Sequence, residues 1–338
     1  MDTLSRLLDL ARPQASLDLR CQLSGAFDID HAPMEAGIAP FHLVLDGVCV
    51  IETAGGAQRE LQAGDFLLFP RGAAHRVRDA KRSAGGMPVT TGHDGMLPVR
   101  RNNGPGFDGE PSSHASAIAQ RELARESGGA SADRHADVDL LCGRFVYAPG
   151  SSALLLKALP DPLHVSLGGA QTLGALQTLI ALMRGEAQRR QAGALAIVTA
   201  LSQALFAMAL RVHGEDSANG AGVLALLTDA RLGASVQAML DAPERAWTIA
   251  ELGERAAMSR ATYARHFNEQ AGVTVMDFLT QVRMTIACDL LLRTRRSAAE
   301  IGETVGYQSE AAFGKAFAQS VGMTPGRYRR RAQTDEAG

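Results

Sequence analysis

The chain has 338 residues, of which 46% are hydrophobic and 21% charged, and its formal net charge is −2 at pH 7. This length and composition fit a multidomain soluble protein in which two or three modules each build a core. The four cysteines show no Cys-x-x-Cys spacing, and the start of the chain lacks the basic and apolar pattern of a secretion signal. We therefore expect a cytoplasmic protein without a disulfide framework.

Short apolar runs separated by glycines dominate the N-terminal part. The runs are residues 41–45, 48–52 and 65–69, and Gly47 and Gly64 are among the glycines between them. Such runs, broken by residues that favour turns, are typical of an antiparallel β structure.

A histidine motif follows these runs. Gly64, Pro70, Gly72 and His75 are separated by five, one and two residues, which matches the second cupin motif, and His42 is what remains of the first. This part therefore resembles a cupin-type sensor domain. The resemblance implies a β-barrel with His42 and His75 as candidates for a ligand pocket.

A cupin can also be a metalloenzyme, because histidines and a carboxylate inside the barrel can hold a divalent ion with an open site. Here Val44 occupies the place of the usual second histidine, and no glutamate follows at the expected spacing. Only His42 and His75 remain as inward candidates. We therefore expect no metal, no cofactor and no catalytic residues. Structural histidines, or a non-catalytic metal or polar ligand held by His42 and His75, remain open, and a cupin enzyme fused to a DNA-binding tail is the alternative function.

Residues 81–137 are rich in Gly, Ser, Ala, Asp, Arg and Pro and contain few large apolar residues. Such a segment buries too little surface to offset the entropy of ordering it. The β pattern resumes at residues 140–147. We therefore expect a mostly disordered insertion between two sensor strands, with a short helix possible at residues 115–125, and replacement of the insertion by a linker should leave the melting temperature unchanged.

A helical period replaces the β pattern at residues 169–213, which favours two antiparallel helices separated by residues 184–193. Residues 193–210 carry no charge, but they contain Thr, Ser and Gln and much alanine, which favours a buried or dimer-forming helix over a membrane span. These helices form a homodimer contact or simply cover the barrel. The expected domains are a sensor at 1–168, a dimerisation and linker segment at 169–241 and a DNA-binding domain at 242–331.

One unit occurs twice in the last hundred residues, at a spacing of fifty. A repeat of this length is a copied supersecondary unit. Residues Ser259, Tyr263, Arg265, Phe267, Gly272, Thr274 and Phe278 recur as Ser309, Phe313, Lys315, Phe317, Gly322, Thr324 and Tyr328.

Each unit is predicted to be a helix, a tight turn and a second helix. Thr248 can cap the first helix, and Ser259 can cap a second helix that carries Tyr263 and Phe267 one turn apart. This is the pattern of a helix-turn-helix, whose second helix lies in the major groove of DNA.

Helical geometry selects the side chains that point away from the buried aromatic residues. Arg265 and Lys315 occupy the same outward place in the two copies, and residues 245–331 carry thirteen Lys or Arg against eight Asp or Glu. A local positive excess suits a polyanion such as double-stranded DNA. The candidate DNA-binding residues are Ser259, Arg260, Ala261, Thr262, Ala264, Arg265, Asn268, Ser309, Glu310, Ala311, Gly314 and Lys315.

The segment 245–331 resembles the AraC/XylS family of bacterial transcription regulators throughout. The motifs that carry the resemblance are residues 247–252, 258–260, 265–267, 283–284, 301–307, 309–310, 313, 315–317 and 322–329. The resemblance implies an all-α domain of seven helices, with two helix-turn-helix units joined by a long helix at 275–293, and RNA polymerase as a partner. Val275 replaces the family's usual proline, and Gly314 interrupts the second recognition helix, so the second unit should contact the DNA backbone more than base edges.

The N-terminal domain also resembles the reactive-chlorine-responsive branch of this family, in which cysteine oxidation activates transcription. The residues concerned are 1–8, Cys21, 64–65, Pro70, 74–76, 142–143, 159–160 and 231–234. Cys21 follows Arg20, and Cys142 lies beside Gly143 and Arg144, so they are the candidate redox-sensing residues, expected to be accessible. On this hypothesis Cys21→Ser should abolish the response to hypochlorite and Cys142→Ser should blunt it. Four inert cysteines and a small ligand near His42 and His75 are the alternative.

Overall fold

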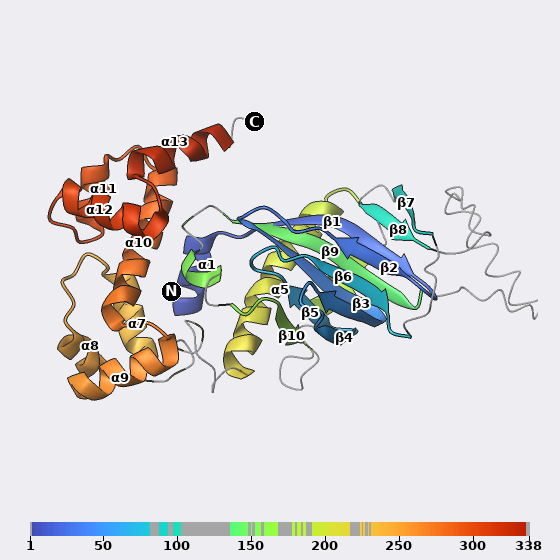
Figure 1. Ribbon diagram of the computed structural model, residues 1–338, viewed down its shortest axis with the longest axis horizontal. Coiled ribbons are helices and arrows are strands. Elements are labelled where there is room, and N and C mark those ends of the chain that lie inside the picture. The colour runs from blue at the N-terminus through green and yellow to red at the C-terminus, as the bar shows by residue number, and fades with distance from the viewer. Residues whose placement is uncertain are drawn as a thin grey trace, which may run out of the picture.

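The computed structural model describes residues 2–81, 88–93, 97–102, 136–147, 150, 153–156, 159–167, 178–179, 181–183, 185–186, 191–216, 224, 226, 229 and 231–335. A β-rich N-terminal region lies beside an all-helical C-terminal region, and the first helix, α1 (Thr3–Ala11), lies between them (Figure 1). The fold is therefore α+β, with its two kinds of secondary structure segregated along the chain.

The N-terminal region is a curled sheet of the cupin type. One path of paired strands runs β10-β5-β3-β9-β1-β8-β7, and β2, β4 and β6 pair outside this path. The strands are β1 (Gln14–Leu23), β2 (Asp28–His31), β3 (Ile38–Thr53), β4 (Gln58–Gln62), β5 (Asp65–Leu68), β6 (His75–Asp79), β7 (Thr90–His93), β8 (Pro98–Arg101), β9 (Val138–Val146) and β10 (Leu163–Ser166).

The long strand β3 makes the sheet curl. Its first half pairs with β5 and β9, whereas its second half pairs with β4 and β6. A strand shared in this way turns the sheet back on itself and encloses an interior. Leu23, Cys49, Phe69 and Cys142 are among the buried residues of that interior.

Part of the predicted insertion is ordered, which corrects the expectation for residues 81–137. Strand β8 pairs in parallel with β1, with Cys21 opposite Arg100, and β7 pairs with β8. Leu97 and Val99 are buried, so apolar residues that are few in the sequence still pack. Replacing the whole segment would therefore remove a strand from the sheet. The helix considered at residues 115–125 lies outside the described residues.

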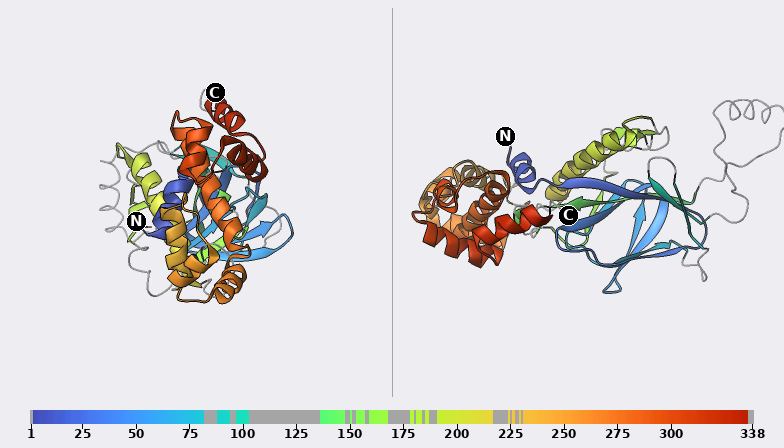
Figure 2. Two further views of the ribbon diagram at one scale, coloured as in Figure 1. Left: turned by 90° about the vertical axis from the view of Figure 1, so that its left-hand side faces the viewer. Right: turned by 90° about the horizontal axis from the view of Figure 1, so that it is seen from above.

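Helix α5 (Ala194–Asp216) covers the outer face of the curled sheet (Figure 2). By length and composition alone, residues 194–214 form the one helix in the described part of the chain that could cross a membrane. One side of α5 is nevertheless buried in a protein core, where the Phe206 and Phe145 rings lie 4.7 Å apart. The first of the two predicted helices falls largely outside the described residues.

The C-terminal region contains the seven helices implied by the family resemblance, within residues 231–335. They are α7 (Leu232–Asp241), α8 (Ile249–Arg255), α9 (Arg260–Ala271), α10 (Val275–Arg293), α11 (Ala298–Thr304), α12 (Glu310–Val321) and α13 (Pro325–Asp335). Val236, Met239 and Leu240 of α7 are fully buried in the same core as α8 and α10. Helix α7, which the predicted boundary at residue 242 places in the linker segment, therefore packs with the helices of the DNA-binding region.

Candidate DNA-binding surface and sensor pocket

The first helix-turn-helix unit consists of α8 and α9. Thr248 and Glu251 form a reciprocal capping box at the start of α8, and the Ser259 side chain caps α9 by accepting the N–H of Thr262. Ala257, between the helices, has φ of 53°, a left-handed conformation that turns the chain sharply. The caps and the turn are where the sequence predicts them.

The second unit, α11 and α12, repeats this construction. Ser297 and Glu300 form the capping box, and Ser309 caps α12 by accepting the N–H of Ala312. Gly306 has φ of 88°, and a Cβ there would lie 2.6 Å from the Glu244 carbonyl oxygen, so only glycine fits this turn.

Aromatic residues fix the recognition helix α9 on the linker helix α10 and the recognition helix α12 on α13. The Phe267 ring packs edge-on against Phe278 of α10, and the Phe317 ring packs in the same way against Tyr328 of α13. Tyr263, Phe267, Phe313 and Phe317 are fully buried. The opposite faces of α9 and α12 are therefore the ones turned to solvent.

The predicted DNA-binding residues lie on those outer faces. Arg265 is 72% exposed and lies 3.7 Å from Glu269 on the same helix, so it is loosely held by one ion pair. Lys315 is exposed at the equivalent place on α12. Among the other candidates, Ala264 and Gly314 are half-buried, and the exposed ones are Ser259, Arg260, Ala261, Thr262, Asn268, Ser309, Glu310 and Ala311.

Three histidines meet inside the curled sheet. His31 comes from β2, His42 from β3 and His75 from β6, and one ring nitrogen of each lies within 4.8 Å of the others. The Nε2 atoms of His42 and His75 are 2.7 Å apart. The rings of His31 and His75 are stacked, and Phe69 stacks on His75 with ring centroids 3.8 Å apart. The sequence predicted two of these histidines as pocket residues and missed the third.

Burial keeps these imidazoles uncharged. The pKa of His42 is held well below its usual value, first by burial and then by the neighbouring His31 and His75. Burial also lowers the pKa of His75, and burial together with His75 lowers the pKa of His31 to about 4. The three rings can therefore act as hydrogen-bond acceptors or metal ligands at neutral pH.

The hydrogen bonds define which ring nitrogen of each histidine carries its proton. His75 Nδ1 lies 2.9 Å from the carbonyl oxygen of Ala73, so it donates there and its Nε2 is an acceptor. His42 Nε2 then donates to His75, and His42 Nδ1 is left to accept from the thiol of Cys142, whose sulfur is 3.1 Å away. The result is a hydrogen-bonded chain from Cys142 through both histidines to the backbone.

Cys142 and Cys21 lie on the same inner face of strands β9 and β1. Cys21 is opposite Leu140 and Cys142 is opposite Leu19, so the two cysteines are diagonal neighbours. The pKa of the Cys142 thiol is raised, first by its hydrogen bond with Cys21 and then by burial. The side chains of Cys21 and Cys142 are only 2% and 6% exposed, so the expectation that they are accessible is wrong. The inner face that carries them is covered by the second half of the sheet.

The arginines next to these cysteines are directed elsewhere. Arg20 Nη2 lies 2.6 Å from a carboxylate oxygen of Asp139, and Arg144 pairs with Asp18. Arg20 and Cys21 are consecutive in β1, so their side chains point to opposite faces, whereas Arg144 lies two residues from Cys142 and is held by Asp18 instead. The group that contacts Cys142 is instead His42, which lies a hundred residues earlier in the chain.

Comparison with known proteins agrees with this architecture. A family model described as Cupin matches residues 2–215, and a model described as Helix-turn-helix domain matches residues 252–331. An uncharacterized HTH-type transcriptional regulator of Haemophilus influenzae is 31% identical over 330 residues, which cover 98% of this chain and 99% of that protein. The chain belongs to the AraC/XylS family of transcription regulators.

Two further relatives align with this AraC/XylS regulator over nearly their whole length. The HTH-type transcriptional regulator MtrA of Neisseria gonorrhoeae is 28% identical, with 98% of each chain covered. The RCS-specific HTH-type transcriptional activator RclR of Escherichia coli is 27% identical, with 98% of this chain and 99% of that protein covered. The regulator therefore shares both of its domains, in the same order, with these proteins.

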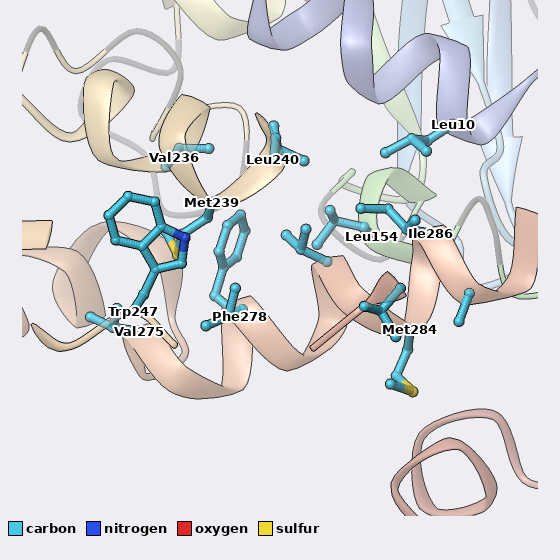
Figure 3. Packing of buried hydrophobic residues seen from close by; sticks show 14 of the residues in the cluster. Leu10, Leu154, Val236, Met239, Leu240, Trp247, Val275, Phe278, Met284 and Ile286 are labelled. Carbon is cyan, nitrogen blue, oxygen red and sulfur yellow. The ribbon is translucent and has the colours of Figure 1, made fainter. Parts of the chain in front are cut away.

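The sensor of the regulator contacts its DNA-binding domain through α1 and the short helix α3 (Ala153–Leu156). Leu10 of α1 and Leu154 of α3 are buried beside Ile286 of α10 (Figure 3). Thr3 Oγ1 donates to the side-chain oxygen of Gln237 on α7 at 2.6 Å, and Arg12 lies 3.6 Å from Asp289 on α10. The linker helix between the two recognition helices is thus packed directly against the sensor.

Proposed function

We propose that this regulator activates transcription from promoters that it binds through both recognition helices, in response to an oxidant sensed by Cys21 and Cys142 in the cupin domain. The observation that carries the sensing part is the contact between Cys142 and His42. The first helix-turn-helix reads base edges through Arg265, and the second, with Lys315, adds contacts to the phosphate backbone.

The contacts of the two cysteines favour Cys142 as the thiol that reacts first, whereas the sequence favoured Cys21. His42 Nδ1 accepts the hydrogen bond of the Cys142 thiol, 3.1 Å from its sulfur, and so orients this thiol inside the barrel. Hypochlorous acid would convert this thiol to a sulfenyl chloride and water. The Cys21 thiol would then attack that sulfur and displace chloride, which yields a disulfide and hydrogen chloride.

A direct structural route connects this chemistry to the DNA-binding domain. Strand β9 carries Cys142 and ends at Val146, and Gly150 soon follows it against the linker helix. A Cβ on Gly150 would lie 2.6 Å from the Cys288 sulfur of α10, so the Gly150 backbone lies directly against the Cys288 side chain. A disulfide between diagonal neighbours on β1 and β9 would shift these strands, and Gly150, four residues after the end of β9, touches Cys288 of α10.

The exposed side of α5 supports a homodimer as the working form. Leu195 and Ile197 are 46% and 44% exposed on a helix whose other side packs on the barrel. We infer that these two exposed apolar side chains at the start of α5 contribute to a contact with a second copy. The dimer would act in the cytoplasm, where it would hold RNA polymerase at the promoter.

We also propose that the cupin domain has no enzymatic activity. The known relatives above are named as regulators, and the histidine cluster of the described residues contains no carboxylate to serve as general acid or base. A turnover assay on small cupin substrates should therefore show no reaction above background.

Transcription from a promoter occupied by the regulator tests this proposal. Hypochlorite should induce transcription in the wild type and in Cys49→Ala, a control that removes a buried thiol of β3 that takes no part in the proposed disulfide. Cys142→Ser and Cys21→Ser should each lose induction while they keep normal DNA affinity. Full induction in both serine variants would exclude the thiol switch and favour a small ligand bound near His42 and His75.

A further inference from the structure

The His42 and His75 rings direct their Nε2 atoms at each other across a gap of 2.7 Å inside the barrel. The bond from His75 Nδ1 to the Ala73 carbonyl keeps an Nε2 lone pair of His75 pointing into that gap. Two lone pairs facing each other at this distance repel, so the gap must contain either the proton of His42 or a cation. His31, from a different strand, brings a third ring nitrogen to the same place.

We propose that His31, His42 and His75 form a binding site for a late first-row divalent metal ion, of which Zn²⁺ is the representative. Imidazole nitrogens select zinc, copper, nickel and cobalt over magnesium and calcium, which require oxygen ligands. Three protein ligands leave the fourth position of a tetrahedral ion open to water or to an anion. The donor set includes His31, which lies outside both cupin motifs.

The dimensions of the cluster fit a metal ion after a small adjustment. Zinc–nitrogen bonds of about 2.0–2.1 Å in a tetrahedral site place ligand nitrogens about 3.4 Å apart. The ligand nitrogens of His42 and His75 are 2.7 Å apart, and no two ligand nitrogens of the cluster are more than 4.8 Å apart. To bind a metal ion, His42 and His75 must therefore move slightly apart, and any more distant pair must move closer together. His31 can move to achieve this, because its ring is only partly buried, at the end of the short strand β2.

The surroundings of the cluster hold the ligands in place. Metal-bound histidines commonly donate their second ring N–H to a backbone carbonyl or another acceptor, as His75 does to Ala73. Metal binding at His42 Nε2 would move that ring's proton to Nδ1, where it faces the sulfur of Cys142. Phe69, stacked on His75, shields one side of the site from water.

Titration of the reduced, tag-free, full-length protein with Zn²⁺ and with Co²⁺ tests the site. We expect one ion per chain and no binding of Mg²⁺. His31→Ala and His75→Ala should each weaken binding more than about tenfold, because even outer-shell partners of a metal contribute that much to its affinity. His93→Ala, which changes an exposed histidine on β7 of the same domain, should bind normally.

The visible spectrum of bound Co²⁺ identifies the ligands. Tetrahedral coordination by nitrogen should give d–d bands without a thiolate-to-cobalt charge-transfer band. A charge-transfer band, or unchanged affinity in His31→Ala, would overturn the three-histidine site. No binding of either ion would show that a proton occupies the gap.

Matching far-ultraviolet dichroism of wild type and His31→Ala shows that the fold is intact, and His31→Gln provides a second variant if alanine unfolds the barrel. The two proposals share His42, but they are tested by separate measurements. Loss of hypochlorite response in Cys21→Ser says nothing about Zn²⁺ binding, and failure of Zn²⁺ to bind leaves the proposed oxidation of Cys142 untouched.

Discussion

The two helix-turn-helix units have the same internal construction but different attachments to the rest of the molecule. In the first unit, Tyr263 donates from its hydroxyl to Ser235 of α7, and His266 lies 2.8 Å from the Asp229 carboxylate. In the second unit, Phe317 packs on Tyr328 of α13, and this helix is held to α10 by Arg329.

These contacts give the units different positions in the regulator. The first unit is tied to α7, which also contacts α1 of the sensor through Gln237 and Thr3. The second is tied to the C-terminal helix and to the far end of α10. A signal from the sensor can therefore act on the first unit through α7 and on both units through the linker helix.

The largest effect should come from removing an aromatic side chain beneath either recognition helix. Phe267 and Phe317 are both fully buried, and truncation of such a residue to alanine costs about 3–5 kcal/mol. Chemical denaturation of Phe267→Ala and Phe317→Ala should show equal losses within about 1 kcal/mol, because the cores are equivalent. A loss under about 1 kcal/mol in either variant would show that its unit is not packed as described.

The next largest effect should be on DNA affinity, and it distinguishes the exposed face of α9 from the exposed face of α12. Arg265→Ala should cost about 1–3 kcal/mol in operator binding and relax the preference at one base pair, since arginine pairs with guanine in the major groove. Lys315→Ala should weaken binding to all sequences alike and reduce the salt dependence. Fluorescence anisotropy on operator variants measures both. If Arg265→Ala retains affinity and preference, the assigned face is incorrect.

A smaller effect should appear at the attachment of the first unit to α7. Tyr263→Phe removes the hydroxyl bond to Ser235 and keeps the ring, so it should reduce the free energy of unfolding by about 0.5–1.5 kcal/mol. Phe313→Tyr places a hydroxyl at the equivalent position of the second unit. We expect no gain there, and a stabilised variant would contradict the difference between the units.

The smallest effect tests the glycine of the second recognition helix. A Cβ on Gly314 meets nothing within 4 Å, so Gly314→Ala should stabilise the free protein by about 0.5–1 kcal/mol. If α12 approaches the DNA backbone closely at this position, the same change should weaken operator binding. Higher stability with unchanged affinity would place Gly314 away from the DNA.

Local sequence signals predicted the C-terminal domain well. Caps such as Ser259 and the aromatic period along one helix act within a few residues, and the linker helix spans the predicted residues 275–293. The sequence placed α7 in the linker segment, because the apolar pattern of a helix does not show which hydrophobic core that helix joins.

The sensor was harder to predict, because its site depends on strands that pair across long distances. His31 joins the cluster only because β2 pairs with β6 and sets it opposite His75. Alternation of side chains along β1 shows that Cys21 and Arg20 face opposite ways, but it does not show which face is covered. The strand β8 in the supposed insertion is short and weakly apolar, so its pairing with β1 had no signal in the sequence.

Genome-wide occupancy and transcription, measured together with and without hypochlorite, test the central claim most directly. The wild type and a Cys21→Ser, Cys142→Ser double variant would be compared in cells that lack the native copy. The account predicts that both occupy the same promoters and that only the wild type activates transcription after hypochlorite. Equal activation by the double variant, or no promoter occupancy by the wild type, would contradict it.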